Sequence, residues 1–250
     1  MARPLYRDHG VVLRTWKLGE ADRIVSVMTR QHGKVRAVVK GVRKTKSRFG
    51  ARVEPTTHGS VQFYLGRDLD ILTQIEVVDA FAAIRGDLTR LGRAAVMLEA
   101  IDQVAPEREP TPELYHLLLG ALRTLDQGDR PLLLSGFLLK LLVAEGVQPA
   151  LDCCVGCGAA DGLGWFDPVA GGTRCRACAA GIALPPGSIG LMAEIIEGRL
   201  RLVLDEVESP ATRAIEAAAT ASLERHLERR LRAPTVAADS SFAPLRAQRA

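Results

Sequence analysis

Residues 10–41, GVVLRTWKLGEADRIVSVMTRQHGKVRAVVKG, decide how the N-terminal part of the chain folds. Three short runs rich in β-branched residues lie within this stretch, at Val11–Thr15, Ile24–Met28 and Val35–Val39. Turn signals separate the runs from one another. We therefore expect three consecutive β-strands here.

Two further runs of the same kind follow, Ser60–Leu65 and Ile71–Val78, on either side of a plausible hairpin turn at Gly66-Arg67-Asp68. Five short strands in about 80 residues predict a small closed or nearly closed barrel. The five-stranded OB-fold is the natural candidate, and an SH3-like barrel is the main alternative.

From Phe81 onward the apolar residues recur at helical spacing, so we expect an α-helical region. The stretch Pro131–Glu145 is apolar almost all round, as the central helix of a bundle would be. The expected helices are Leu88–Val104, Pro112–Gln127, Pro131–Glu145, Gly187–Glu197 and Ala211–Leu231.

A cysteine cluster interrupts the helical region. Cys154 and Cys157 form one C-x2-C pair, Cys175 and Cys178 form a second, and 17 residues separate the two. Four thiolates on two tight turns suit the tetrahedral coordination of zinc, so we predict a zinc site with four cysteine ligands. Free thiols or a redox pair are the alternative. Cys153 would give a C-x3-C spacing with Cys157, so we prefer Cys154 as the ligand, although Cys153 could substitute.

The predicted metal is structural, because four cysteines would leave no open coordination position for a substrate. The fold class is accordingly α+β and multidomain, with a five-stranded OB-fold barrel followed by an α-helical domain that carries an inserted four-cysteine zinc module. The expected divisions are residues 1–80 for the barrel, 81–150 and 184–232 for the helical domain, 151–183 for the zinc insert and 233–250 for a flexible tail.

Positive charge is concentrated in the first third of the chain. Residues 1–80 hold 15 lysines and arginines against 8 acidic residues, whereas the remaining 170 residues hold 18 against 21. Much of this excess lies in residues 34–52, KVRAVVKGVRKTKSRFGAR, which contain no acidic residue and which we call the basic segment. It indicates a surface that binds a polyanion, with a solvated loop as the alternative.

Seven side chains of the basic segment are the predicted phosphate contacts. They are Lys34, Lys40, Arg43, Lys44, Lys46, Arg48 and Arg52. Single-strand-binding proteins combine such a basic groove with aromatic side chains on which bases stack. Trp16 and Phe49 are the freer candidates for stacking. Phe63 and Tyr64 share a strand, so at least one of them must point into the core.

The sequence favours a binding protein over an enzyme, and we identify no catalytic residue. GVRKTKS lacks the glycine and lysine spacing of a P-loop. The zinc deaminase signature, H-x-E together with P-C-x-x-C, is absent because Cys154 follows Cys153 and not a proline. The N-terminal residues MARPLYRDHG lack the apolar stretch of a signal peptide. We expect a cytoplasmic protein without a membrane anchor, in which cysteines bind metal or stay reduced.

The stretch GVVLRTWKLGEADRIVSVMTRQHGKVRAVVKGVRKTKSRF resembles the opening of the bacterial recombination mediator RecO family. The likeness rests on Gly10–Leu13, Glu20, Asp22, Thr29, Gly33-Lys34, Lys40-Gly41 and Lys46-Ser47-Arg48. The later LDCCVGCG and GGTRCRAC stretches, with Pro149 just before them, are similar to the zinc module of many family members. The additional Cys153 departs from the family pattern.

This resemblance implies a DNA repair and recombination protein whose OB-fold binds single- and double-stranded DNA. It implies annealing of complementary strands without ATP and, together with RecR, help in loading RecA onto DNA covered by single-strand-binding protein. It also implies a groove in the helical domain for the C-terminal tail of single-strand-binding protein, and a nucleoid-associated location in the cytoplasm.

Two readings from other functional classes remain. One is an RNA- or ribosome-associated protein that combines an OB-fold with a zinc ribbon, which a preference for structured RNA would indicate. The other is a nuclease or nucleic-acid-modifying enzyme that uses the metal.

Overall fold

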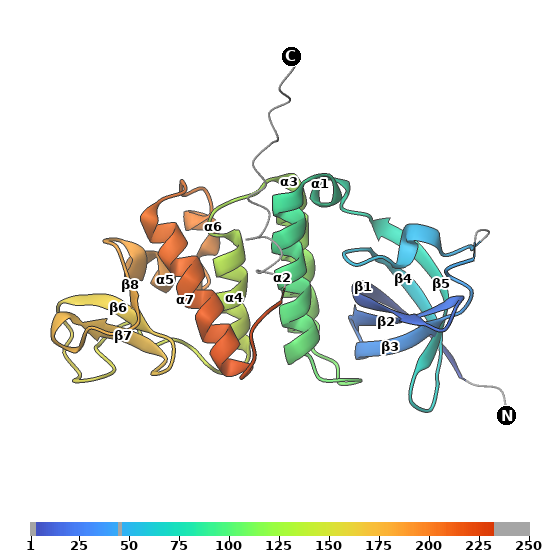
Figure 1. Cartoon of the computed structure of the whole chain (residues 1–250), viewed down its shortest axis with the longest axis horizontal. Helices are drawn as coiled ribbons and strands as arrows, with labels where there is room; N and C mark the ends of the chain where they lie inside the picture. Colours follow the sequence, from blue (N-terminus) through green and yellow to red (C-terminus); the bar gives the residue numbers. More distant parts are fainter. Residues whose placement is uncertain (1–3, 45–46, 233–250) are drawn as a thin grey trace, which may run out of the picture.

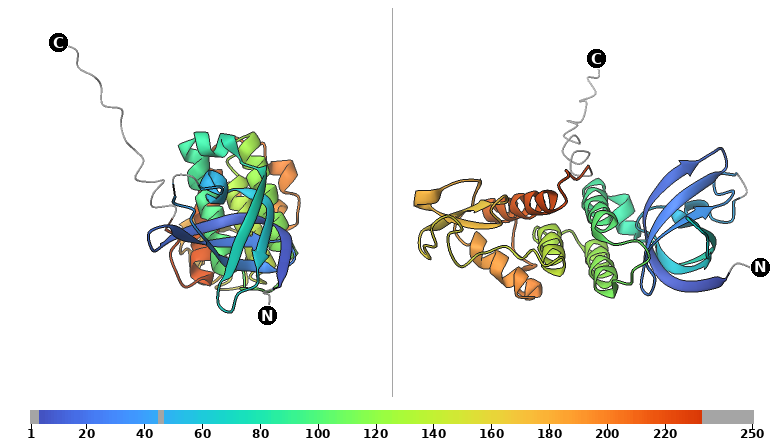
Figure 2. Two further views of the ribbon diagram at one scale, coloured as in Figure 1. Left: turned by 90° about the vertical axis from the view of Figure 1, so that its right-hand side faces the viewer. Right: turned by 90° about the horizontal axis from the view of Figure 1, so that it is seen from below.

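The structure, a computed structural model, describes residues 4–44 and 47–232. Three parts follow one another along its longest axis: a β-barrel, a group of helices and a small three-stranded sheet (Figure 1). The view from below shows the same order, with the barrel and the small sheet at opposite ends (Figure 2). Within the described ranges, no helix is long and apolar enough to cross a membrane. The predicted flexible tail at residues 233–250 lies outside the described residues.

The first part is a closed, OB-like barrel, which confirms the predicted fold class. Its strands are β1 (Leu5–Leu18), β2 (Asp22–Thr29), β3 (Gly33–Val39), β4 (His58–Tyr64) and β5 (Asp70–Asp79). They are hydrogen-bonded in the order β1-β2-β3-β5-β4, and only the β3–β5 contact is parallel among these pairs. Alternate residues point inward, so Val25, Val27 and Phe63 fill the interior with no exposed surface.

The turn between β2 and β3 packs closely against the connection that follows α2 (Leu88–Val104). Gly33 has a φ of +67°, and a Cβ built on it would lie 1.9 Å from the carbonyl oxygen of Glu109. A side chain is therefore excluded at this position by both conformation and space. The next residue, Lys34, forms a β-bridge with Glu107, and its carbonyl accepts a 2.9 Å hydrogen bond from the backbone N–H of Arg108.

The helices expected from the sequence are present in the second part, two with the predicted ends and three with shifted ends. Besides α2 they are α3 (Pro112–Gln127), α4 (Leu133–Ala144), α5 (Ser188–Ile196) and α7 (Pro210–His226). Two short helices, α1 (Ala82–Gly86) and α6 (Leu200–Val203), had no clear periodic signal. Helix α4 is buried on nearly all sides, as its uniformly apolar sequence predicts.

Helix α3 is joined to the barrel by a polar cluster around the buried His58 ring. The His58 ring donates from Nδ1 to the Asp79 carboxylate at 2.9 Å, and its Nε2 lies 2.9 Å from the Tyr115 hydroxyl. Arg123 donates to the same carboxylate at 3.0 Å. Burial lowers the pKa of His58 below its ordinary value, although Asp79 opposes this shift, so His58 favours the neutral form in the fold.

The third part consists of β6 (Leu163–Asp167), β7 (Gly172–Cys175) and β8 (Ile182–Ala183), in the order β7-β6-β8. One face of this sheet packs on the helices, because Phe166 and Leu184 belong to the same hydrophobic cluster as α2, α3, α4, α5 and α7. Val11, Leu13 and Met28 of the barrel join that cluster from the other end. A continuous core therefore connects all three parts.

Candidate nucleic-acid interface and metal centre

The connection from the end of β3 to η1 (Gly50–Val53) carries most of the basic segment. Five of the predicted phosphate contacts are exposed there, and we call them the loop cations: Lys40, Arg43, Lys44, Arg48 and Arg52. Among the residues that the structure describes, none of the five forms an ion pair with an acidic side chain. Their charges therefore remain available to an external anion.

The barrel holds this connection at several points. The Asp22 carboxylate accepts a 2.7 Å hydrogen bond from the backbone N–H of Gly41, and the Ala21 carbonyl accepts one at 2.9 Å from the backbone N–H of Arg43. The guanidinium of Arg48 donates at 3.0 Å to the Thr73 carbonyl on β5. The loop cations on either side of the gap at residues 45–46 are thus attached to a rigid scaffold.

Lys34 takes a different position from the one predicted for it. Only 9% of its surface is exposed, and its ammonium donates a 2.6 Å hydrogen bond to the Asp102 carbonyl in the last turn of α2. The helix cannot satisfy this carbonyl itself, because the residue four positions on is Pro106, which has no N–H. Lys34 is therefore a structural contact between barrel and helix, and we withdraw it from the phosphate contacts.

Two other basic residues of the segment differ from the loop cations. Lys46 lies outside the described residues, so the structure gives no contact for it. Arg36 is exposed on β3 and pairs with Glu107 at 3.3 Å, which compensates its charge locally.

The aromatic candidates divide between core and surface. Phe49 is 5% exposed and packs in the barrel core, so the expectation that it is free for stacking is wrong. Phe63 is fully buried and Tyr64 is 41% exposed, as expected for neighbours on one strand. Trp16 is half-buried near the end of β1, with the guanidinium of Arg14 5.0 Å from its ring centre.

The cysteine cluster forms in the third part of the molecule. The sulfur atoms of Cys154, Cys157, Cys175 and Cys178 all lie within 4.8 Å of one another. The Sγ atoms of Cys157 and Cys175 are 3.6 Å apart. Cys153 is exposed and lies outside this group, although its carbonyl accepts a 3.1 Å hydrogen bond from Thr173. Four converging thiols of this kind can hold a metal ion.

The environment affects the thiols unequally. Backbone hydrogen bonds, the strongest involving Cys175, lower the pKa of Cys154 to about 6. Neighbouring sulfurs, first that of Cys157, raise the pKa of Cys178 to about 12. Cys178 therefore resists ionising beside the other sulfurs, and a cation bound to the cluster would remove that repulsion.

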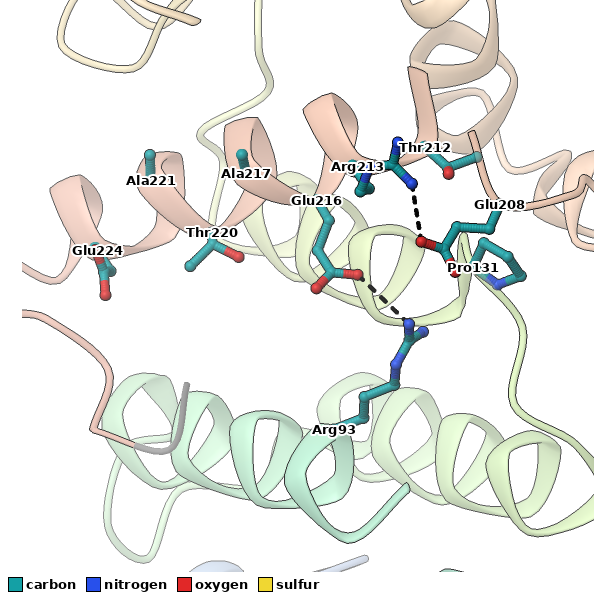
Figure 3. A pocket seen from close by; sticks show the side chains of 10 residues that line it. All are labelled: Arg93, Pro131, Glu208, Thr212, Arg213, Glu216, Ala217, Thr220, Ala221 and Glu224. Carbon is teal, nitrogen blue, oxygen red and sulfur yellow. Dashed lines mark hydrogen bonds and ion pairs between the residues drawn. The ribbon is translucent and has the colours of Figure 1, made fainter. Parts of the chain in front are cut away.

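A groove of about 550 Å³ lies between α2 and α7 (Figure 3). Its charged side chains pair largely with each other: Arg93 approaches Glu216 at 3.9 Å, and Arg213 pairs with Glu208 at 2.9 Å. Because these charges are compensated within the groove, it offers little attraction to a charged ligand.

A second groove, of about 320 Å³, lies between α3, α4 and α6 and has a different character. Its lining includes the apolar side chains of Phe137, Leu200 and Leu204 together with two cations, Lys140 and Arg201. In the described part of the chain, neither cation has an ion-pair partner. Burial, and then the charge of Arg201, lower the pKa of Lys140. An anion bound here would relieve this repulsion.

Two family models match the chain and together cover nearly all of it. A model described as Recombination protein O N terminal matches residues 1–81, which include the barrel. A model described as Recombination protein O C terminal matches residues 85–234, which include the helices and the cysteine cluster.

Because Lys34 binds the Asp102 carbonyl and Lys44 is exposed, replacing these two lysines should affect the stability of the protein differently. Replacing Lys34 by Met keeps the aliphatic stem but leaves the Asp102 carbonyl without its donor, so we expect the free energy of unfolding to fall by about 1–3 kcal/mol. Lys44→Met is the matched control, because the side chain is exposed, and it should change this free energy by less than about 0.5 kcal/mol. Urea denaturation of the two variants measures the difference, and equal effects would contradict the assignment.

Proposed function

The chain belongs to the recombination protein O family, and we propose that its barrel anneals complementary DNA strands without ATP. Membership makes it a DNA-binding mediator of recombination and repair. The observation that carries the finer proposal is the set of loop cations, which are exposed, fixed to the barrel and unpaired among the described residues. With Lys46 they form our proposed set of phosphate contacts.

Annealing follows from charge neutralisation that leaves the bases accessible. Two complementary strands repel each other through their phosphates, and cations that bind the phosphates reduce this repulsion. Contacts to the backbone carry no sequence information and leave the base edges free to pair. This process needs no covalent chemistry, so we propose that the protein acts as a binder and not as an enzyme.

We further propose that the protein works with RecR to load RecA onto DNA covered by single-strand-binding protein, and that the groove between α3, α4 and α6 binds the C-terminal tail of that protein. Any C-terminal tail ends in a carboxylate, which Lys140 and Arg201 would attract. Leu200 and Leu204, both partly exposed, offer an apolar surface to side chains next to that carboxylate. The unpaired cations favour this groove over the one between α2 and α7.

For the four-cysteine cluster we propose zinc as the metal. Around a zinc ion with Zn–S bonds of about 2.3 Å, tetrahedral geometry separates the sulfurs by about 3.8 Å. The 3.6 Å between the sulfurs of Cys157 and Cys175 is close to that value. The ion would brace the turns that carry the cysteines, next to the sheet that packs on the helices through Phe166.

The contribution of the loop cations can be measured through salt dependence. We expect the triple variant Lys40→Gln, Arg43→Gln and Lys44→Gln to reduce the slope of log affinity against log salt for single-stranded DNA by about 2, or about 0.7 per lost contact. Arg176→Gln, Arg199→Gln and Arg213→Gln together remove the same charge from exposed positions outside the barrel, and this control should keep the slope. Equal slopes in both variants, or tighter binding of structured RNA by the wild type, would contradict the proposal.

The zinc proposal assigns different roles to two adjacent cysteines, Cys153 and Cys154. We expect about one zinc ion per chain in the wild type and in Cys153→Ser, and loss of this zinc in Cys154→Ser, because only the latter removes a sulfur from the cluster. Atomic absorption of the purified proteins gives the metal content, and circular dichroism checks that each variant folds. Full zinc content in Cys154→Ser, or its loss in Cys153→Ser, would show that the ligand is wrongly assigned.

If the groove between α3, α4 and α6 binds the tail, charge reversal within this groove should weaken peptide binding. Lys140→Glu should weaken binding of a peptide with the C-terminal sequence of the single-strand-binding protein at least about tenfold, since it replaces attraction for the carboxylate by repulsion. Arg213→Glu, in the charge-compensated groove next to α2, is the matched control. Fluorescence anisotropy of the labelled peptide measures both, and the proposal fails if Lys140→Glu binds as the wild type does.

A further inference from the structure

A row of partly exposed apolar side chains crosses three strands of the barrel on its outer face. Trp16 of β1 lies directly opposite Ile24 of β2, and Ile24 lies opposite Val38 of β3. All three are half-buried. Since paired residues on neighbouring strands share a face, their side chains form one continuous strip, which we call the outer row.

The outer row is the part of this face that the helices leave open. One step further along the strands, Ser26 donates a 2.7 Å hydrogen bond to the Asp102 carboxylate of α2. Beyond it, Met28 packs in the helical core and Lys34 is bonded to α2. Helix α2 therefore covers one end of the β1–β2–β3 face, and the outer row begins where that cover stops.

Positive charge flanks the outer row on two sides. Arg14 lies on the side toward α2, with its guanidinium 5.0 Å from the centre of the Trp16 ring. Lys40 follows Val38 by two residues and begins the set of loop cations on the opposite side. Arg14 has no ion-pair partner among the residues that the structure describes. A nucleic-acid backbone could thus follow cations along either edge of an apolar strip.

We propose that the outer row is a stacking floor for the bases of single-stranded DNA, with Trp16 as the residue on which a base stacks. This inference rests on the proposed DNA-binding function and adds the contact that recognises unpaired bases. Aromatic and apolar side chains between backbone-binding cations suit single-stranded nucleic acid, whose bases expose their faces, whereas bases in a duplex are already stacked. Strands β2 and β3 also form the face on which OB-folds bind oligonucleotides.

The two tryptophans of the chain allow a direct test. In a Trp165→Phe protein, Trp16 is the sole source of tryptophan emission, and stacking of a base on the indole should quench it. We expect titration with a thymidine oligonucleotide to quench Trp16 strongly, and a chain of abasic sugar-phosphates of the same length to bind more weakly without comparable quenching.

Affinities provide the second readout. Trp16→Ala should weaken binding of single-stranded DNA by about 5- to 150-fold, the range expected for the loss of one stacked base. Its salt slope and its affinity for duplex DNA should stay unchanged, because the phosphate contacts remain. Trp16→Phe should retain much of the affinity, and Trp165→Phe is the control without effect.

The possible outcomes distinguish base stacking on Trp16 from the proposed DNA-binding function. Salt-dependent DNA binding with unquenched Trp16 emission and full affinity of Trp16→Ala would overturn the stacking floor and leave the proposed function standing. Absence of DNA binding by the folded Trp165→Phe and wild-type proteins would overturn both. Because quenching is read in a protein that retains Trp16, misfolding of Trp16→Ala would not remove the test.

Discussion

The hydrogen bond from the buried Lys34 ammonium to the Asp102 carbonyl fixes the barrel on the helices. It satisfies a carbonyl that Pro106 leaves without an intrahelical donor, and it places a cation at the C-terminal end of α2, where the helix dipole favours positive charge. The neighbouring Gly33 permits the close approach that this contact needs. With the barrel held in this way, α2 covers one end of the β1–β2–β3 face, and the connection that carries the loop cations stays exposed.

The proposed binding surfaces are separated along the length of the molecule. The loop cations belong to the barrel, the groove with two unpaired cations belongs to the helices, and the cysteine cluster lies in the part farthest from the barrel (Figure 1). The shared hydrophobic core, to which Val11, Phe137 and Phe166 contribute from the three parts, connects these surfaces mechanically. Our division into domains at residues 80, 150 and 183 remains a proposal, since this core crosses all three boundaries.

Local patterns in the sequence predicted the features that depend on local chemistry. Runs rich in β-branched residues indicated the strands, helical spacing predicted α2 and α3 with their ends, and two C-x2-C pairs indicated the cluster. Lys34 and Phe49 are buried because elements distant in the sequence pack over them. Both lie in the same basic segment as the exposed loop cations, so the local sequence does not distinguish them from exposed residues. The position of Lys34 in the sequence does not indicate that its ammonium binds the Asp102 carbonyl. The one local signal is Pro106, four residues after Asp102, because a proline has no N–H and the Asp102 carbonyl therefore needs another donor. The grooves between helices likewise arise only from packing.

We propose above all that this barrel neutralises two DNA strands so that they can pair. The most direct measurement is the annealing rate of complementary oligonucleotides coated with the cognate single-strand-binding protein, in the absence of nucleotide. We expect the wild-type protein to accelerate annealing well above the rate without it, and the acceleration to decline as salt rises. A folded protein with its metal bound that leaves the rate unchanged would contradict the claim.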